Sequence, residues 1–240
     1  MRVLVVTAVP VERDAVTRAF GGGPQTVALP GAVLHRSGAF DVLAGGAGPA
    51  AAAAATAFAL ASAPRGGGPR PYGLVVSAGI GGAYTPVTPL GSPVVASGIV
   101  AADLGAESPD GFLPVTALGF GRDRFAPPPA LVREVAAATG AATGPVLTVS
   151  TATGTAERAA ALLAAHPGAL AEAMEGFGVA EAAERAGVPV MELRTVSNAV
   201  GPRDRDAWRI GDALAALTEA FGKSAPVLEG WNRHDDRHRG

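Results

Sequence analysis

Short, valine-rich apolar runs that alternate with helical segments constrain the fold of this chain more than any other feature. The runs RVLVVTA at residues 2–8, GLVVS at 73–77 and SPVVASGIVA at 92–101 are typical of strands buried on both faces. Between two of them lies a very alanine-rich segment, residues 50–61, with the composition of a helix. This alternation predicts a single three-layer α/β/α domain over residues 1–230, with a central mixed, mostly parallel sheet.

The rest of the chain continues the same pattern. Further strands are expected at residues 29–43 (two or three short strands), 145–150 and 190–196, and further helices at 130–139, 155–165 and about 207–222. Residues 64–71 (PRGGGPRP) are expected to be a loop by composition. The polar and charged residues 231–240 are expected to be a disordered tail.

Composition excludes several classes of function. The 240 residues carry a formal net charge of -2, so nucleic acid is not an expected partner. No segment has the length of a membrane span or a signal peptide, and we therefore expect a cytoplasmic protein without a membrane partner. The chain has no cysteine, which removes disulfides and thiolate chemistry. No metal is predicted, because the four histidines lack the spacing of metal ligands; they are His35, His166, His234 and His238.

Residues 46–51 (GAGPAA) imitate a dinucleotide-binding fingerprint, since they follow a predicted strand and open a predicted helix. The fingerprint also needs an acidic residue about 20 residues further on, which holds the ribose hydroxyls. Residues 65–68 are RGGG instead, with no acid. We therefore predict no dinucleotide cofactor and interpret these glycines as a tight turn.

Three places carry polar or glycine-rich sequence at the end of a predicted strand, where open α/β sheets bind ligands. Glu175 lies between a strand-like and a helix-like segment, although a surface glutamate at such a turn is the commoner case. Residues 78–82 (AGIGG) could present backbone amides to a ligand or form a plain turn. Residues 194–198 (RTVSN) end the last strand, where Ser-Asn could also serve as a helix cap or Asx turn.

Four motifs, taken in order, resemble the nucleoside phosphorylase/nucleosidase superfamily over residues 2 to about 221. They are Glu12 after the first strand, S-A-G-x-G-G at 77–82, M-E-G at 174–176, and R-x-x-S-N at 194–198. Within it, the methylthioadenosine/S-adenosylhomocysteine nucleosidases are the best-known similar enzymes. The finer patterns MEGFGVA and SNxVGPRDRDAW resemble the futalosine hydrolases. That resemblance implies release of hypoxanthine from futalosine in menaquinone biosynthesis.

The resemblance also implies a role for each matching residue. Glu12 would be the base that activates the attacking water, and Glu175 would hold the ribose hydroxyls. Asn198 would bind the purine at N7 and O6, and Phe177 would either stack near the ligand or pack in the core. The other implied pocket residues are Met174 against the sugar, Ile80, Gly81 and Gly82 in the turn, and Ser197 beside Asn198.

Asn198 is a departure from the adenine-specific nucleosidases, which carry Asp there. The Asn amide has both a donor and an acceptor, so it can donate to a 6-oxo oxygen, whereas an ionised Asp would face that oxygen with like polarity. A site matched by hydrogen bonding can reject the mismatched analogue by a factor of about 10⁴ or more. Asn198 therefore predicts a 6-oxopurine. Because Asn cannot be a general acid, the proton for the leaving base must come from water or another group.

Water is the predicted nucleophile, since phosphorolysis needs a cluster of arginines near the N-terminal turn and only Arg13 and Arg18 follow Glu12. The resemblance implies a benzoate on the 5′ side of the substrate, for which Arg203 and Arg205 are candidate partners. The alternative is that these arginines form surface ion pairs.

Other functions are kept as alternatives: a purine nucleoside phosphorylase, a methylthioadenosine/S-adenosylhomocysteine nucleosidase, and a non-catalytic nucleoside-binding sensor. The resemblance implies no cofactor, a small-molecule nucleoside substrate, and a homodimer or higher homo-oligomer.

Overall fold

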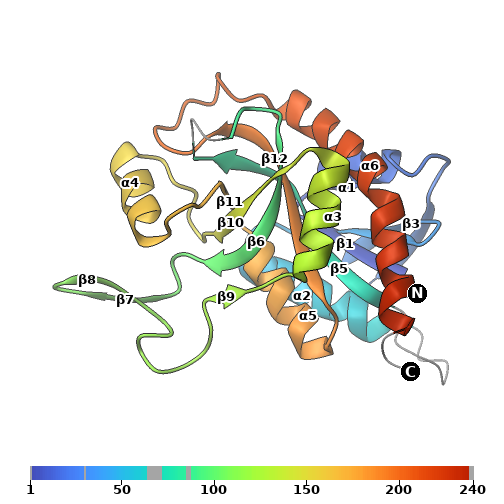
Figure 1. The fold of residues 1–240 in the computed structure, drawn as a ribbon, viewed down its shortest axis with the longest axis horizontal. Helices are drawn as coiled ribbons and strands as arrows, with labels where there is room; N and C mark the ends of the chain where they lie inside the picture. Colours follow the sequence, from blue (N-terminus) through green and yellow to red (C-terminus); the bar gives the residue numbers. More distant parts are fainter. Residues whose placement is uncertain (1, 30, 64–71, 85–87, 238–240) are drawn as a thin grey trace.

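The computed structural model describes residues 2–29, 31–63, 72–84 and 88–237, with side chains described as far as Trp231 (Figure 1). The loop predicted at residues 64–71 and the last three residues of the predicted tail lie outside this part. None of the helices described here has the length and apolar character needed to cross a membrane.

Strands and helices follow one another along the described chain, with runs of consecutive strands before the second and third helices. The strands are β1 Arg2–Thr7, β2 Gln25–Leu29, β3 Ala32–Ser37, β4 Phe40–Ala44, β5 Tyr72–Ala83, β6 Pro93–Ala101, β7 Gly105–Ser108, β8 Gly111–Pro114, β9 Arg124–Phe125, β10 Ala142–Thr148, β11 Ala171–Ala173 and β12 Val190–Ala199. The helices are α1 Pro10–Arg18, α2 Pro49–Ser62, α3 Pro129–Thr139, α4 Ala156–Ala165, α5 Gly176–Ala186 and α6 Ile210–Arg237.

The main sheet has the order β11-β10-β6-β12-β5-β1-β4-β3-β2, with β9 on β6. Parallel ladders join β4, β1, β5 and β12 in the centre and β6, β10 and β11 beyond it. The β12–β6 ladder and the outer ladders of β2, β3 and β4 are antiparallel. The sheet is therefore mixed, as predicted, with parallel ladders on both sides of the antiparallel β12–β6 ladder.

One additional pairing changes the shape of this sheet. Strand β11 pairs not only with β10 but also with the far end of β5, where Glu172 lies opposite Gly82. Strands β5, β12, β6, β10 and β11 are thereby closed into a ring. The end of β5 that takes part contains Gly79, Gly81 and Gly82, which favour a bend in a long strand. Hydrophobic periodicity does not predict such a closure.

Helices cover both faces of the sheet, which confirms the α/β class. On one face α2 and α5 enclose a core that includes Leu43, Val75 and Val179. On the other face α1, α3 and α6 enclose a core that includes Val5 and Phe221. Figure 1 shows these two groups of helices on opposite sides of the central strands.

Helix α6 is longer than the sequence suggests. It continues past Trp231 to Arg237, through the first part of the segment that was expected to be a disordered tail. It also contains Pro226.

Strands β7 and β8 form a separate two-stranded arm that projects from the main body of the molecule (Figure 1).

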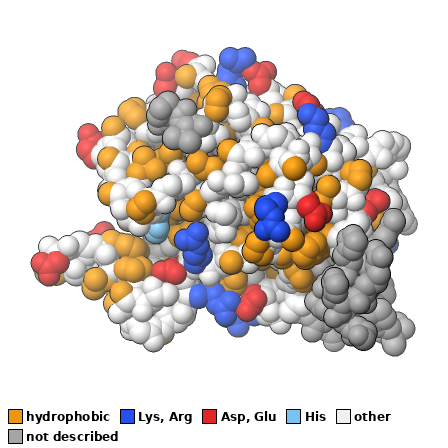
Figure 2. Space-filling model, viewed as in Figure 1, with side chains coloured by type: hydrophobic (Ala, Val, Ile, Leu, Met, Phe, Trp, Pro, Cys, Tyr) orange, Lys and Arg blue, Asp and Glu red, His pale blue; other side chains and the backbone are white. Residues whose placement is uncertain are grey.

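The surface mixes both charge signs. On the face drawn in Figure 2, basic and acidic side chains are interspersed, and hydrophobic side chains gather on the arm. The large hydrophobic residues exposed on and near the arm are Leu104, Phe112, Leu113 and Phe120.

The contact between α2 and α5 gives a test of the fold. Gly178 of α5 faces Pro49 of α2 so closely that a Cβ would overlap the carbonyl of Pro49. We expect Gly178→Ala to lower the free energy of unfolding by about 2 kcal/mol, since overpacking costs roughly 1–3 kcal/mol. Gly222→Ala is the matched control in α6, where the added methyl group meets nothing within 4 Å.

The control should raise the free energy of unfolding by about 0.5–1 kcal/mol, because alanine is the better helix former. Urea denaturation followed by circular dichroism measures both. A Gly178→Ala variant as stable as the wild type would contradict the close approach of the two helices.

Candidate active site

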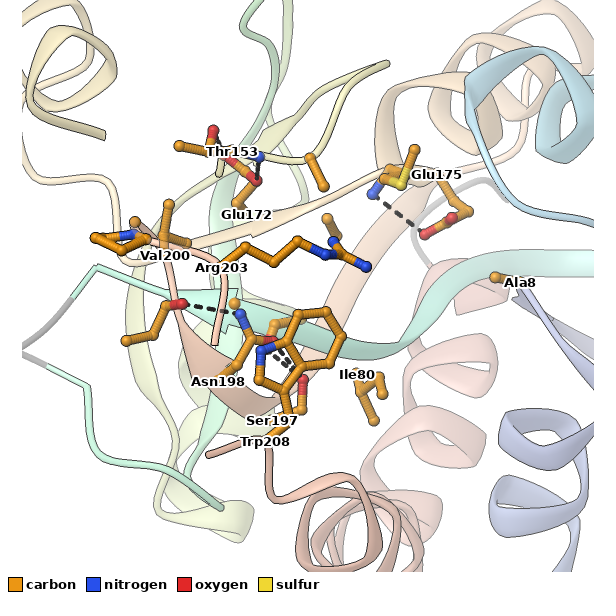
Figure 3. Close-up of a pocket in the computed structure, with 18 of the residues that line it drawn as sticks. Ala8, Ile80, Thr153, Glu172, Glu175, Ser197, Asn198, Val200, Arg203 and Trp208 are labelled. Atoms are coloured by element: carbon orange, nitrogen blue, oxygen red, sulfur yellow. Dashed lines mark hydrogen bonds between the residues drawn. The ribbon is translucent and has the colours of Figure 1, made fainter. Parts of the chain in front are cut away.

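One cavity of about 180 Å³ contains nine of the eleven candidate site residues that the sequence and the resemblance single out (Figure 3). They come from the start of α1, the far end of β5, the β11–α5 junction, the end of β12 and the segment that follows it. These residues are Glu12, Ile80, Gly81, Gly82, Met174, Glu175, Ser197, Asn198 and Arg203. Residues distant in sequence thus meet at one end of the sheet.

Phe177 and Arg205 do not line this cavity. Phe177 is 8% exposed, and its ring packs against Phe125, with the ring centroids 5.2 Å apart. Of the two roles that the sequence left open for Phe177, the structure places it in the core. Its backbone N–H donates to Oγ1 of Thr148, which anchors the first turn of α5.

Glu12 is the third residue of α1, and its carboxylate bonds back to the chain that enters the helix. Oε2 accepts from the backbone N–H of Ala8 at 3.0 Å and of Val9 at 3.2 Å, as in half of a capping box. Oε1 accepts from the N–H of Ile80 at 2.9 Å. Burial raises the pKa of Glu12 above its ordinary value of 4.5, against the opposing charge of Arg194. The acid is thus fixed in place and ready to accept a proton nearer neutral pH.

Glu175 precedes α5 and binds the start of another helix. Its Oε1 accepts from the N–H of Gly48 at 3.2 Å, and Gly48 is the residue that caps α2. Its Oε2 accepts from the N–H of Met174 at 3.3 Å. The glycine turn that imitates a dinucleotide fingerprint therefore holds a carboxylate of the protein itself, at a helix N-terminus that favours negative charge.

Arg194 lies beside the two acids; it belongs to the motif at residues 194–198, but it received no role of its own from the sequence. It is completely buried in β12. Its Nε donates to Oε1 of Glu192 at 2.9 Å and its Nη2 to Oγ of Ser77 at 3.0 Å. Its Nη1 lies 3.2 Å from Oε2 of Glu175 as an ion pair. The available signal was an arginine inside a buried strand, which requires acidic partners.

The free face of Arg194 lies beside Glu12. A Cβ at Gly79 would lie 2.6 Å from Oε1 of Glu12 and 2.8 Å from Nη1 of Arg194, so only glycine fits between them. Burial alone would lower the pKa of Arg194, but Glu192, Glu175 and Glu12 raise it above its usual value. Nη1 forms its ion pair with Glu175 and lies next to Glu12 as well. A permanent buried cation therefore stands beside both acids.

Asn198 and Ser197 form the opposite wall. Ser197 Oγ donates toward Oδ1 of Asn198 at 2.8 Å, and Nδ2 of Asn198 donates to the carbonyl of Ala199 at 2.9 Å. This leaves the amide one N–H and one lone pair for a ligand. A Cβ at Gly82 would lie 3.0 Å from Nδ2 of Asn198, so the glycine clears space for the amide.

The other lining residues include three with polar or aromatic side chains that received no role from the sequence: Thr153, Glu172 and Trp208. Glu172 is 6% exposed and accepts hydrogen bonds from Thr153 and Tyr84. Trp208 lies under the guanidinium of Arg203, 5.3 Å from ring centroid to Cζ. An acid in an otherwise apolar strand, Ala171–Ala173, is the signal that would have identified Glu172.

In the part of the chain that the structure describes, no three histidine, aspartate or glutamate side chains are grouped to hold a metal ion. The cavity can hold a small polar molecule between two fixed acids on one side and an amide on the other. With Arg194 beside the acids, the arrangement can deprotonate a water molecule and stabilise positive charge that develops next to the carboxylates.

Solved structures share this fold. A methylthioadenosine/S-adenosylhomocysteine nucleosidase from Neisseria meningitidis, in complex with methylthio-immucillin-A, superposes with a TM-score of 0.78 at 18% identity, covering 93% of this chain and 98% of that chain. A nucleosidase of the same name from S. pneumoniae, with a transition-state inhibitor, gives a TM-score of 0.77 at 19% identity over 94% of this chain and 100% of that one.

Sequence comparison is closer. Residues 5–229 match the family model of the phosphorylase superfamily. A futalosine hydrolase from Streptomyces coelicolor is 65% identical over 98% of this chain and 100% of its own length. A futalosine hydrolase from Acidothermus cellulolyticus is 46% identical over 91% of this chain and 88% of its own. On this evidence the chain belongs to the phosphorylase superfamily and, within it, to the futalosine hydrolase family.

Proposed function

We propose that this protein is a nucleosidase that hydrolyses the N-ribosidic bond of futalosine, releasing hypoxanthine and dehypoxanthine futalosine for menaquinone biosynthesis. The observation that supports it most is that Glu12, Glu175 and Asn198 line one cavity. The carboxylates of Glu12 and Glu175 lie on the wall of the cavity next to Arg194, and the amide of Asn198 lies on the opposite wall. This is the arrangement expected of a site that holds a sugar next to a purine.

The two acids have separate roles in the proposed mechanism. Cleavage of the bond builds positive charge on the sugar, and Glu175 is the carboxylate that binds its hydroxyls and stabilises that charge. Glu12 accepts a proton from the attacking water as general base. Its raised pKa suits this role, because a base works best with a pKa nearer the working pH. Arg194 pairs with Glu175, while backbone N–H groups hold Glu12 in place.

Charge favours water over phosphate as the nucleophile. Three carboxylates line the cavity, those of Glu12, Glu172 and Glu175, and among its described lining residues the cation is Arg203. Arg194 behind them is engaged by Glu192 and Glu175. Arg13, one of the two arginines after Glu12, pairs with Asp14 at 2.8 Å. A phosphate dianion would thus meet more negative than positive charge.

Glu12→Gln is expected to lower the rate of hypoxanthine release by about 10²–10⁴-fold, the usual contribution of a general base. The amide oxygen can still accept a backbone hydrogen bond, so the fold should persist. Chromatography of the released base measures the rate. Glu184→Gln, at an exposed acid paired with Arg122, is the matched control and should leave the rate unchanged. Wild-type rates in Glu12→Gln would rule out the base.

The pH dependence follows from the same acid. Burial raises the pKa of Glu12 above 4.5, and only the ionised form accepts a proton. We therefore expect kcat/KM to fall as the pH drops through this raised pKa, with the acid limb above pH 4.5. A profile measured between pH 4 and 9 tests this. A limb at or below 4.5, or an identical limb in Glu12→Gln, would contradict the assignment.

Asn198→Asp should lower kcat/KM for 6-oxopurine nucleosides relative to 6-aminopurine nucleosides. The carboxylate of Asp would face the 6-oxo oxygen with like polarity, whereas it can accept a hydrogen bond from a 6-amino group. Parallel assays with inosine and adenosine measure the ratio, which we expect to change by at least about tenfold. An unchanged ratio would remove Asn198 from base recognition.

Arg203 is proposed to meet the carboxylate on the 5′ side of futalosine. It lines the cavity and projects across it in Figure 3, supported by Trp208. Arg205 also lies over Trp208, with Cζ 5.7 Å from the ring centroid, but does not line the cavity. It therefore serves as a matched control.

We expect Arg203→Gln to raise KM for futalosine about 10-fold or more, since a charged hydrogen bond contributes about 1.5–3 kcal/mol. Inosine, which lacks the carboxylate, should show no change. Arg205→Gln should leave both substrates unaffected. Equal effects of the two substitutions on futalosine would show that Arg203 has no direct contact with the substrate.

The alternatives separate in one assay. Futalosine, inosine and methylthioadenosine are incubated with and without phosphate, and free base is followed by chromatography. Phosphate-dependent release of base would indicate a phosphorylase. A preference for methylthioadenosine would indicate a methylthioadenosine/S-adenosylhomocysteine nucleosidase, and no release of base would indicate a binding protein.

We also propose that the protein is a cytoplasmic homo-oligomer, in which a partner copy would cover the apolar residues of the β7–β8 arm.

A further inference from the structure

Glu172 stands across the cavity from Asn198, on the same face of the sheet. Gly82 of β5 is opposite Glu172 in the antiparallel β11 ladder and opposite Asn198 in the parallel β12 ladder. Residues opposite each other on neighbouring strands project to the same face, and two strand spacings make about 10 Å. Gly82 places no side chain between them. Figure 3 shows Glu172 and Asn198 on opposite sides of the pocket.

The hydrogen bonds of Glu172 leave one position open. Oε1 accepts from the N–H of Thr153 at 2.8 Å, and Oε2 accepts from its hydroxyl at 2.5 Å and from the hydroxyl of Tyr84 at 3.1 Å. Burial and the neighbouring Glu172 raise the pKa of Tyr84, so its hydroxyl remains a donor. A carboxylate has about four acceptor positions, of which three are filled.

Glu172 also lacks a cation. Among the described residues no arginine or lysine forms an ion pair with it, in contrast to Glu175 and Glu192. A buried carboxylate without a cation is costly, and a donor from a ligand would reduce that cost. Because the acid lines the cavity, the open acceptor position is available to a ligand bound there.

The two walls differ in what they can recognise. The amide of Asn198 has a donor and an acceptor, so it can adapt to an oxo or an amino group. The carboxylate of Glu172 only accepts. A 6-oxopurine carries an N–H at ring position 1, next to the oxo group, whereas a 6-aminopurine has a bare nitrogen acceptor there. A carboxylate therefore matches the first base and repels the second.

We propose that Glu172 accepts a hydrogen bond from the N1–H of a 6-oxopurine whose other edge binds Asn198, and that Glu172 sets the preference for 6-oxo over 6-amino bases. This inference rests on the proposed nucleosidase function. Thr153 and Tyr84 hold the carboxylate in position for that contact. If Glu172 had only a structural role, it would hold Thr153 against β11 by hydrogen bonds and would not discriminate between purine bases.

The first experiment needs no variant. Isothermal titration measures the affinity of the wild-type protein for hypoxanthine, 1-methylhypoxanthine and adenine. The affinity for 1-methylhypoxanthine, in which a methyl group replaces the N1 hydrogen, should be at least about 100-fold lower than that for hypoxanthine. The affinity for adenine should be lower by a similar factor, because a site built to accept an N–H rejects analogues that lack it. Equal affinity for hypoxanthine and 1-methylhypoxanthine would overturn the proposal.

The second experiment compares kcat/KM for futalosine and its 6-amino analogue. In Glu172→Gln the ratio should fall at least about 10-fold, because the Gln amide can donate to a bare N1. Glu184→Gln, at the exposed acid paired with Arg122, is the control and should leave the ratio unchanged. A proportional loss for both substrates in Glu172→Gln, with the ratio unchanged, would assign Glu172 a structural role only.

The two experiments also separate this inference from the proposed function. If the wild-type protein releases no base from either nucleoside, the proposed function fails, while the affinities for the free bases still report on Glu172. If it cleaves futalosine but does not distinguish the methylated base, the function stands and the role of Glu172 fails.

Discussion

A single buried guanidinium determines the geometry of this site. Arg194 is completely enclosed, and an unpaired charge at such a depth would destabilise the fold by several kcal/mol. It is compensated by Glu192 beside it and by Glu175 from another element. Burial raises the pKa of Glu192 and of Glu12, and the neighbouring charge of Glu175 adds to the rise, against the opposing charge of Arg194. Structural and chemical demands are therefore met by the same ion cluster.

Glycines make this cluster sterically possible. A Cβ at Gly79 would displace Glu12 and Arg194, and one at Gly176 would overlap the carboxylate of Glu192. Gly82 has the same function for Asn198. The glycine-rich end of β5 is part of the strand rather than the turn that the sequence suggested, and its missing side chains provide the volume that the polar groups occupy. This explains in physical terms why the motif S-A-G-x-G-G accompanies the two acids.

The sequence predicts the strands and the principal polar residues well, because both depend on local signals. Valine-rich runs mark buried strands, and the polar residues that follow them meet at one edge by the geometry of the sheet. Arg194 and Glu172 were not assigned, because their significance depends on partners that are close only in space, such as Glu175 and Tyr84. The closure of β11 onto β5 is equally non-local.

Two other differences have simple causes. Phe177 could face either side of its helix, and one aromatic residue does not reveal which side is covered. The segment after Trp231 lacks apolar periodicity, so its composition suggested a tail. Adding residues to an existing helix avoids the cost of nucleation, which allows a polar segment to continue α6.

The tight contact of Gly178 with Pro49 has a consequence for mechanics. Glu175 stands immediately before α5, and Gly48, whose N–H it accepts, stands immediately before α2. The backbone of α2 at Pro49 occupies the space where a side chain at Gly178 of α5 would lie. With no side chains between them, the two helices cannot slide past each other while this contact lasts. The carboxylate of Glu175, which is assigned to the sugar, is therefore held between two rigid helices rather than on a flexible loop. Its thermal motion is limited to that of the helix pair.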